Sequence, residues 1–145
     1  MKVLQINSVC GIGSTGKIVM DIHNLLIEHN YESYIAYGRD LSKNCNNIIR
    51  IGNKIDNYIH AVKTRIFDLH GFGSKKATIT FIEEVIKVDP DIIHLHNIHR
   101  YYINIEVLFN YLKEAKKPVI WTLHDCWSFT GHCSHFDYIG CEKWK

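Results

Sequence analysis

Short apolar runs alternate with longer amphipathic stretches along the chain, and this alternation predicts a parallel α/β sheet. The apolar runs have the length of buried strands. They are Val3–Val9, Ser33–Tyr37, the short run Asn47–Ile51, Ile92–His96 and Val119–Leu123. Since the stretches between them have helical periodicity, we expect a Rossmann-like α/β fold, with a parallel sheet flanked by helices.

Apolar side chains recur at helical spacing between these strands, and each such row predicts a helix face that packs on the sheet. The rows are Ile18, Ile22, Leu25 and Leu26; Ile55, Tyr58, Ile59, Val62, Ile66 and Leu69; Phe81, Ile82, Val85 and Ile86; and Ile105, Leu108, Phe109 and Leu112. Asn53 and Asn104 precede the second and the fourth row and are expected to cap those helices.

The composition is that of one globular domain covering residues 1–145, with 46% hydrophobic and 22% charged residues. A formal net charge of +2 is too small to indicate a nucleic-acid surface. No apolar run approaches the roughly 20 residues that cross a bilayer. The start MKVLQINSV is more typical of a strand than of a signal peptide, so we expect a cytoplasmic protein with reduced cysteines.

The segment VCGIGSTGKI at residues 9–18 fits several phosphate-binding templates. A nucleotide-triphosphate loop needs Ser or Thr after Lys17 to hold magnesium, and Ile18 stands there instead. A purely structural alternative is that the glycines turn the chain and that Ser14 or Thr15 caps the following helix.

The same glycines also match a dinucleotide fingerprint, which leaves an NAD(P)-dependent oxidoreductase as an alternative function. Arg39 and Asp40 follow the second strand where a ribose-binding group is expected. However, the polar pair Asn7 and Ser8 lengthens the connection between the first strand and the glycines, which the fingerprint does not favour.

Polar clusters follow three of the predicted strands, at residues 8–17, 94–100 and 124–126. Ligands of open α/β sheets bind beyond the carboxyl ends of the strands, so we expect function at these clusters. In the second cluster, Arg100, Tyr101 and Tyr102 could hold an acceptor sugar by hydrogen bonding and stacking, or form an ordinary loop.

The segments GSTGKIVMDI, PDIIHLHNIHRYYINIEVLFNYL and PVIWTLHDCWSFTGHCSHFDYIGCEKW resemble the amino-terminal half of family 4 glycosyltransferases. The closest resemblance is to the bacterial exopolysaccharide, capsule and lipopolysaccharide type. It implies the GT-B architecture, in which two Rossmann-like domains face a cleft and the first domain binds the acceptor. The reaction it implies is retaining transfer of a sugar from a nucleotide-diphosphate sugar to a glycan or lipid-linked acceptor.

The resemblance assigns roles to residues at all three strand ends. His124 is placed near the transferred sugar, and Asp125 is expected to orient acceptor hydroxyls or the His124 imidazole. His96 and Asn97 are expected to line the acceptor side. The glycine loop is expected to border the cleft through Gly13, Ser14, Thr15, Gly16 and Lys17.

The family generally uses no metal, so we expect no metal site and no cofactor beyond the nucleotide-sugar donor. The family's donor-binding domain has no counterpart here, and related sequences continue beyond Lys145. We therefore expect the chain to be a fragment with an incomplete first domain, a truncated product, or a half that needs a separate donor-binding partner, and to be inactive or nearly so by itself. An inactive or merely sugar-binding domain is the alternative. Peripheral contact with the inner membrane through Lys113, Lys116 and Lys117 is a further expectation.

Cysteine and histidine are frequent near the carboxyl end, which raises the hypothesis of a zinc site. The residues concerned are His124, Cys126, His132, Cys133, His135 and Cys141. Their spacing lacks the close CxxC pairs of structural zinc modules, so we expect a reduced, aromatic-packed loop instead.

Overall fold

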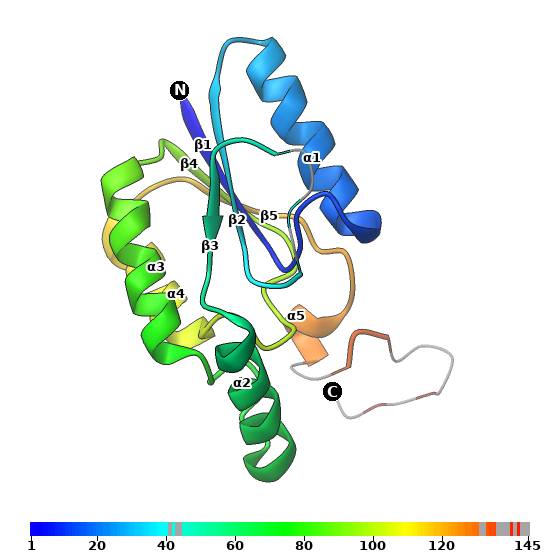
Figure 1. The fold of residues 1–145 in the computed structure, drawn as a ribbon. Helices are drawn as coiled ribbons and strands as arrows, with labels where there is room; N and C mark the ends of the chain where they lie inside the picture. Colours follow the sequence, from blue (N-terminus) through cyan, green and yellow to red (C-terminus); the bar gives the residue numbers. More distant parts are fainter. Residues whose placement is uncertain (41, 43–44, 131–132, 136–139, 141, 143–145) are drawn as a thin grey trace.

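The computed structural model describes residues 1–40, 42, 45–130, 133–135, 140 and 142. Its centre is a five-stranded, all-parallel sheet with helices on both faces (Figure 1). The strand order is β3-β2-β1-β4-β5. The strands are β1 (Lys2–Asn7), β2 (Glu32–Tyr37), β3 (Ile48–Arg50), β4 (Ile92–Leu95) and β5 (Val119–Trp121). The predicted Rossmann-like α/β fold is therefore confirmed, with every predicted strand present.

Helices form crossover connections between parallel strands of the sheet. They are α1 (Gly13–Glu28), α2 (Lys54–Phe67), α3 (Lys75–Val88), α4 (Ile105–Ala115) and the short α5 (Trp127–Thr130). Helix α1 packs on β1 and β2, whereas α3 and α4 pack together on the other face. Helix α2 extends away from the sheet at its carboxyl edge (Figure 1). Within the described residues, no helix combines the length and apolarity of a membrane span.

The sheet separates two kinds of side chain because successive residues of a strand point to opposite faces. Leu4 and Ile6 of β1 join the main core with Ile93 and Leu95 of β4, beneath α3 and α4. Gln5 lies on the opposite face, which carries α1, and is fully buried. The α1 face of the central strands is thus partly polar, and this polar part leads to the candidate site.

The inward face of α1 differs from the expected one. Ile18 and Leu25 are exposed, and the buried residues are Gly16, Val19 and His23. The helix is rotated by about one position because His23 is held by a 2.8 Å hydrogen bond between its Nδ1 and the Ser33 hydroxyl of β2. A side chain at Gly16 would lie 3.1 Å from Val9, so the helix approaches the preceding loop closely there.

In α3 and α4, most of the expected inward residues are buried, including Phe81, Val85, Leu108 and Leu112. Ile86 is wrongly assigned to the inward face, because it is 61% exposed. Phe109 is partly exposed because it lies beside a pocket.

Two of the three predicted helix caps are confirmed. The Asn53 side chain accepts hydrogen bonds from the backbone N–H groups of Ile55 and Asp56, and Asp56 completes a capping box. The Asn104 side chain accepts from the N–H of Val107. The prediction for Ser14 or Thr15 is wrong, because α1 already begins at Gly13, whose φ of +67° favours glycine.

Helix α2 is present as predicted, but it buries a different face from the one that its long apolar row predicts. The expected inward row is exposed at Ile55, Tyr58, Ile59, Ile66 and Leu69. The residues that α2 buries are His60 and Thr64. His60 is held on both ring nitrogens: Nε2 accepts from the N–H of Gly73, and Nδ1 lies 3.0 Å from the Ser74 hydroxyl. Hydrogen bonds therefore fix the orientation of this helix, and its apolar row faces outward.

A tight contact between Gly38 and Tyr102 provides a test of the fold. A Cβ atom at Gly38 would lie 2.0 Å from the Tyr102 ring, which is fully buried. We expect Gly38→Ala to lower the free energy of unfolding by about 2–3 kcal/mol, measured by urea denaturation. Gly13→Ala is the matched control, because no atom lies within 4 Å of its Cβ position and only the positive φ opposes it. Equal stability of Gly38→Ala and the parent chain would contradict this packing.

Candidate functional site

The candidate site begins with histidines that end two neighbouring strands. Strand β4 pairs with β5 so that Leu95 lies opposite Trp121, which places His94, His96 and Thr122 on one face of the sheet. His94 is hydrogen-bonded across the strands through Nε2 to the Thr122 hydroxyl at 2.8 Å. The same pairing brings His124, just beyond β5, to 2.9 Å from His96. Two predicted site residues that are 28 positions apart are therefore in direct contact.

A chain of hydrogen bonds fixes the protonation of these rings. The Gln5 side chain donates from Nε2 to the carbonyl oxygen of Val19, so its Oε1 faces Nε2 of His96 at 3.3 Å. Because an amide oxygen only accepts, Nε2 of His96 carries the proton and its Nδ1 accepts from Nε2–H of His124. In a neutral His124 imidazole, Nδ1 is then left as a hydrogen-bond acceptor, and no described residue bonds to it.

Burial keeps the imidazoles of His94 and His96 uncharged. His96 is 1% exposed, and desolvation together with the nearby His94 and His124 lowers its pKa from about 6.5 to about 3. Desolvation, with a smaller effect of His124, also lowers the pKa of His94. A positive charge on either ring would lack a counter-ion here, so the arrangement holds neutral imidazoles in place for hydrogen bonding.

Asp125 contacts a histidine that the sequence analysis did not single out. Its Oδ2 lies 2.7 Å from Nε2 of His99, and its Oδ1 accepts from the N–H of Trp127. Burial lowers the pKa of His99 although Asp125 raises it, so we describe this contact as a hydrogen bond from a neutral imidazole. The structure gives Asp125 no bond to His124, and the carboxylate instead fixes the start of α5.

The predicted residues His96, Asn97, His124 and Asp125 line one recess at the carboxyl edge of the sheet. Its volume of about 10 Å³ is room for a single water molecule. A larger apolar pocket of about 480 Å³ adjoins it. The residues that line both hollows are Ile98, Trp121, Trp127 and Ser128.

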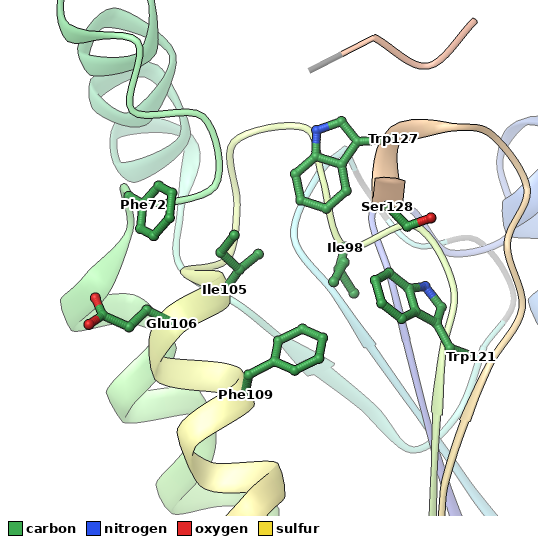
Figure 2. Close-up of a pocket in the computed structure, with 8 residues that line it drawn as sticks. All are labelled: Phe72, Ile98, Ile105, Glu106, Phe109, Trp121, Trp127 and Ser128. Carbon is green, nitrogen blue, oxygen red and sulfur yellow. The ribbon is translucent and has the colours of Figure 1, made fainter. Parts of the chain in front are cut away.

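Aromatic side chains from separate elements surround the larger pocket. Figure 2 shows Ile105 and Phe109 of α4 facing Trp121 and Trp127, with the Glu106 carboxylate turned away from the rings. The Trp127 indole N–H donates to Nδ1 of His70, and the Trp121 indole N–H donates to the carbonyl oxygen of His96. Apolar walls beside a few fixed polar groups are the usual form of a small-molecule site.

The glycine loop lies beside this recess without lining it. The recess is not lined by any of the loop residues Gly13, Ser14, Thr15, Gly16 and Lys17. Asn7, at the end of β1, connects the two places: its Nδ2 donates to the carbonyl oxygen of Val9, and its Oδ1 accepts from the N–H of Asn97. The structure therefore joins the loop and the histidines through one buried amide.

Arg100 and Tyr101 do not line the recess. Tyr102 is fully buried and its hydroxyl donates to the carbonyl oxygen of Asn97, so it is a core residue and not a sugar-binding one. Arg100 and Tyr101 have left-handed backbone conformations, with φ of 80° and 67°, which cost of order 1–3 kcal/mol each for non-glycine residues. The Tyr101 ring contacts those of His60 and His70 and lines a separate pocket with Arg39. Tyr101 reaches the candidate site only indirectly, through the contact of His70 with Trp127.

Sequence reasoning missed Gln5, Asn7 and His99 as members of the site. Gln5 and Asn7 are polar residues within an otherwise apolar strand, and each is 0% exposed. This was the available signal, because a buried amide in a central strand must find hydrogen-bond partners. His99 carries no comparable signal, since its partner is 26 positions away.

The zinc hypothesis concerns residues that the structure describes only in part. His132 and Cys141 lie outside the described residues. Within the described ranges, no three His, Cys, Asp or Glu side chains are placed to hold a metal. Cys126 and Cys133 form no disulfide. The expectation of a metal-free, reduced loop stays a prediction.

The buried histidines make stability depend on pH. Their folded-state pKa values, about 3 for His96 and about 4 for His60, lie below the unfolded value of about 6.5. The unfolded chain therefore binds more protons, and stability is full above pH 6.5 and falls as the pH drops toward 4. When the pH falls from 6.5 to 5, the free energy of unfolding should drop in both proteins. We expect the drop to be about 2 kcal/mol smaller in His96→Asn than in the parent, measured by urea unfolding. The exposed His29→Asn is the control, and parallel pH profiles for parent and His96→Asn would refute the buried neutral state.

Comparison with known proteins shows a similarity to a protein named for colanic acid biosynthesis. No profile of a known protein family matches the chain. All of it aligns, at 27% identity over 157 positions, with the Escherichia coli K12 protein named "Putative colanic acid biosynthesis glycosyl transferase WcaC". The chain spans 38% of the length of that protein. The chain is thus similar in sequence, over its full length, to part of a protein named as a glycosyl transferase.

Proposed function

We propose that this chain forms the acceptor side of a retaining GT-B glycosyltransferase of family 4. The reaction is transfer of a sugar from a nucleotide-diphosphate sugar to a glycan or lipid-linked acceptor in surface polysaccharide synthesis. The observation that carries the proposal is the contact of His96 with His124 beside a large aromatic pocket. The alignment of the whole chain with 38% of the colanic acid protein supports it.

In this proposal, His124 contacts the sugar through Nδ1, the ring nitrogen to which no described residue bonds. The chain from Gln5 through His96 orients the ring and commits Nε2 to donating, so Nδ1 accepts from a sugar hydroxyl. A ring nitrogen in a fixed orientation contributes more binding free energy than a mobile one, because its orientation is set before the sugar arrives. The Trp127 wall of the aromatic pocket offers an apolar surface for a sugar ring, and Asp125 acts as a positioning residue for that wall.

The glycine loop serves the departing diphosphate in this scheme. Helix α1 begins at Gly13, and its N-cap residue Ile12 makes no side-chain hydrogen bond to the first turn. The first N–H groups therefore remain for an anion, and the helix dipole favours negative charge there. Gly13 has open space around its Cβ position, so a phosphate can approach its backbone. Negative charge develops on the diphosphate as the sugar–phosphate bond breaks, which is where fixed donors help.

Binding of simple sugars tests the role of His124. We expect saturation-transfer NMR to detect a panel of methyl hexopyranosides on the chain, with binding about three- to tenfold weaker in His124→Ala through loss of one hydrogen bond. The exposed His29→Ala is the matched control and should bind as the parent does. Equal binding by His124→Ala and the parent would remove His124 from the proposed contact.

Transfer activity tests the assignment of this chain to one side of the enzyme. We expect the 145 residues alone to transfer no radiolabelled sugar from UDP- or GDP-hexoses to oligosaccharide acceptors above background. The physical reason is that the proposal assigns the donor to a second domain, so the chain alone cannot hold both reactants together. A purified hexosyltransferase with the same donors verifies the assay. Robust turnover by the chain would disprove the acceptor-side assignment, whereas sugar binding without turnover agrees with it.

A further inference from the structure

Three sulfur-bearing side chains from separate parts of the chain meet beside helix α1. Cys10 lies in the connection between β1 and α1, Met20 lies on α1, and Cys45 lies in the connection between β2 and β3. The Sγ atom of Cys10 lies 3.8 Å from the Sδ atom of Met20. Cys45 and Met20 both pack against the small buried cluster that contains Cys10. We call these three side chains the sulfur cluster.

The Cys10 thiol contacts both of the other sulfurs. It can donate its hydrogen to the Sδ of Met20, and it also makes a side-chain hydrogen bond with Cys45. The Cys45 thiol donates to the carbonyl oxygen of Asn46 at 3.3 Å, so its sulfur is an acceptor toward Cys10. Thiol and thioether sulfurs form only weak hydrogen bonds. These contacts therefore add little stability to the fold by themselves.

Burial makes the sulfur cluster a poor target for oxidation. Cys10 is 1% exposed, and desolvation, with a smaller effect of Cys45, raises the pKa of its thiol to about 12. Desolvation also raises the pKa of Cys45. Because the thiolate is the form that reacts with oxidants, these thiols are not an activated redox pair at neutral pH, and both are free cysteines. A metal ion that prefers sulfur displaces the thiol proton directly and does not need an activated thiol.

The spacing of the sulfurs fits a three-coordinate metal ion. Metal–sulfur bonds of about 2.3 Å that point to the corners of a triangle place neighbouring sulfurs about 4 Å apart. The 3.8 Å between Sγ of Cys10 and Sδ of Met20 is close to that separation. Thiolate with thioether is a ligand set for Cu(I), whereas Zn²⁺ is bound by Cys, His, Asp and Glu side chains. Within the described part of the chain, no three side chains of those four types are placed to share a metal.

We propose that Cys10, Met20 and Cys45 bind one Cu(I) ion through their three sulfur atoms. The two thiols release their protons to water on binding, and the thioether binds without a change of protonation. Met20 and Cys45 are partly exposed, so the ion reaches the buried Cys10 from their side. Two thiolates and one Cu(I) carry one negative charge in all. The Arg50 guanidinium offsets part of it, since it lies 5.1 Å from the ring centre of Tyr37, a member of the same buried cluster.

The sulfur cluster lies outside the candidate site. It is built on α1 and on the connections that follow β1 and β2, whereas the histidines of the candidate site stand at the ends of β4 and β5. The proposal therefore does not depend on the proposed sugar transfer. It departs from the expectation, based on the sequence, that the chain has no metal site.

Anaerobic titration with Cu(I), in competition with a chromophoric Cu(I) chelator, tests the proposal. We expect the chain to hold one equivalent of Cu(I) against the chelator. Cys45→Ser should weaken binding by more than about tenfold, since even the outer partners of metal ligands contribute about 10- to 100-fold to affinity. Met20→Leu keeps the side-chain volume and removes the sulfur, so it should weaken binding by about tenfold. X-ray absorption at the copper edge should show three sulfurs at about 2.3 Å in the parent and two in Met20→Leu.

Cys133→Ser is the matched control, because Cys133 is a partly exposed free cysteine outside the sulfur cluster. It should hold Cu(I) as the parent does, and circular dichroism with urea unfolding should show that all variants fold. The proposal is overturned if the parent loses Cu(I) to the chelator, if either Cys45→Ser or Met20→Leu binds as tightly as the parent, or if the copper has nitrogen ligands. Binding that Cys133→Ser weakens and Cys45→Ser does not would place the metal in the carboxyl-terminal loop and would also overturn it.

Discussion

A hydrogen-bond chain across three parallel strands holds the candidate site together. It runs from the carbonyl oxygen of Val19 through Gln5 and His96 to His124. Gln5 and His96 are polar groups removed from water, and such a group is costly unless it is paired. Slipping one strand by a single residue would turn the histidines to the apolar face and leave Gln5 without its partner. The strand register and the site geometry are therefore one constraint.

The candidate site and helix α2 share the carboxyl edge of the sheet, and polar contacts orient both. His96 is fixed by an amide and a second imidazole, and His60 by a backbone N–H and a hydroxyl. The contact with His96 leaves Nδ1 of His124 to accept from a sugar in the proposed function.

Hydrophobic periodicity succeeded for the strands and failed for two helix faces, for a physical reason. A strand inside a parallel sheet is recognisable because helices cover both of its faces, so its sequence is mainly apolar. An apolar row at helical spacing shows that one side of the helix is apolar, but it does not predict what covers that side. In α2 the buried side is made by His60 and Thr64, and in α1 by Gly16, Val19 and His23. Specific polar contacts outweighed the apolar pattern in both helices.

The sequence alone determined the positions of the strands along the chain and their parallel arrangement, the asparagine caps of α2 and α4, and the polar residues that end β1, β4 and β5. These features are local, since each depends on neighbouring residues. Only the tertiary structure decided which polar residues meet: His124 with His96, and Asp125 with His99. Such partners are far apart along the chain, and the pairing of β4 with β5 and the path of the loops beyond them bring them together. The local sequence therefore shows which polar side chains stand at the strand ends, and strand pairing decides which of them are in contact.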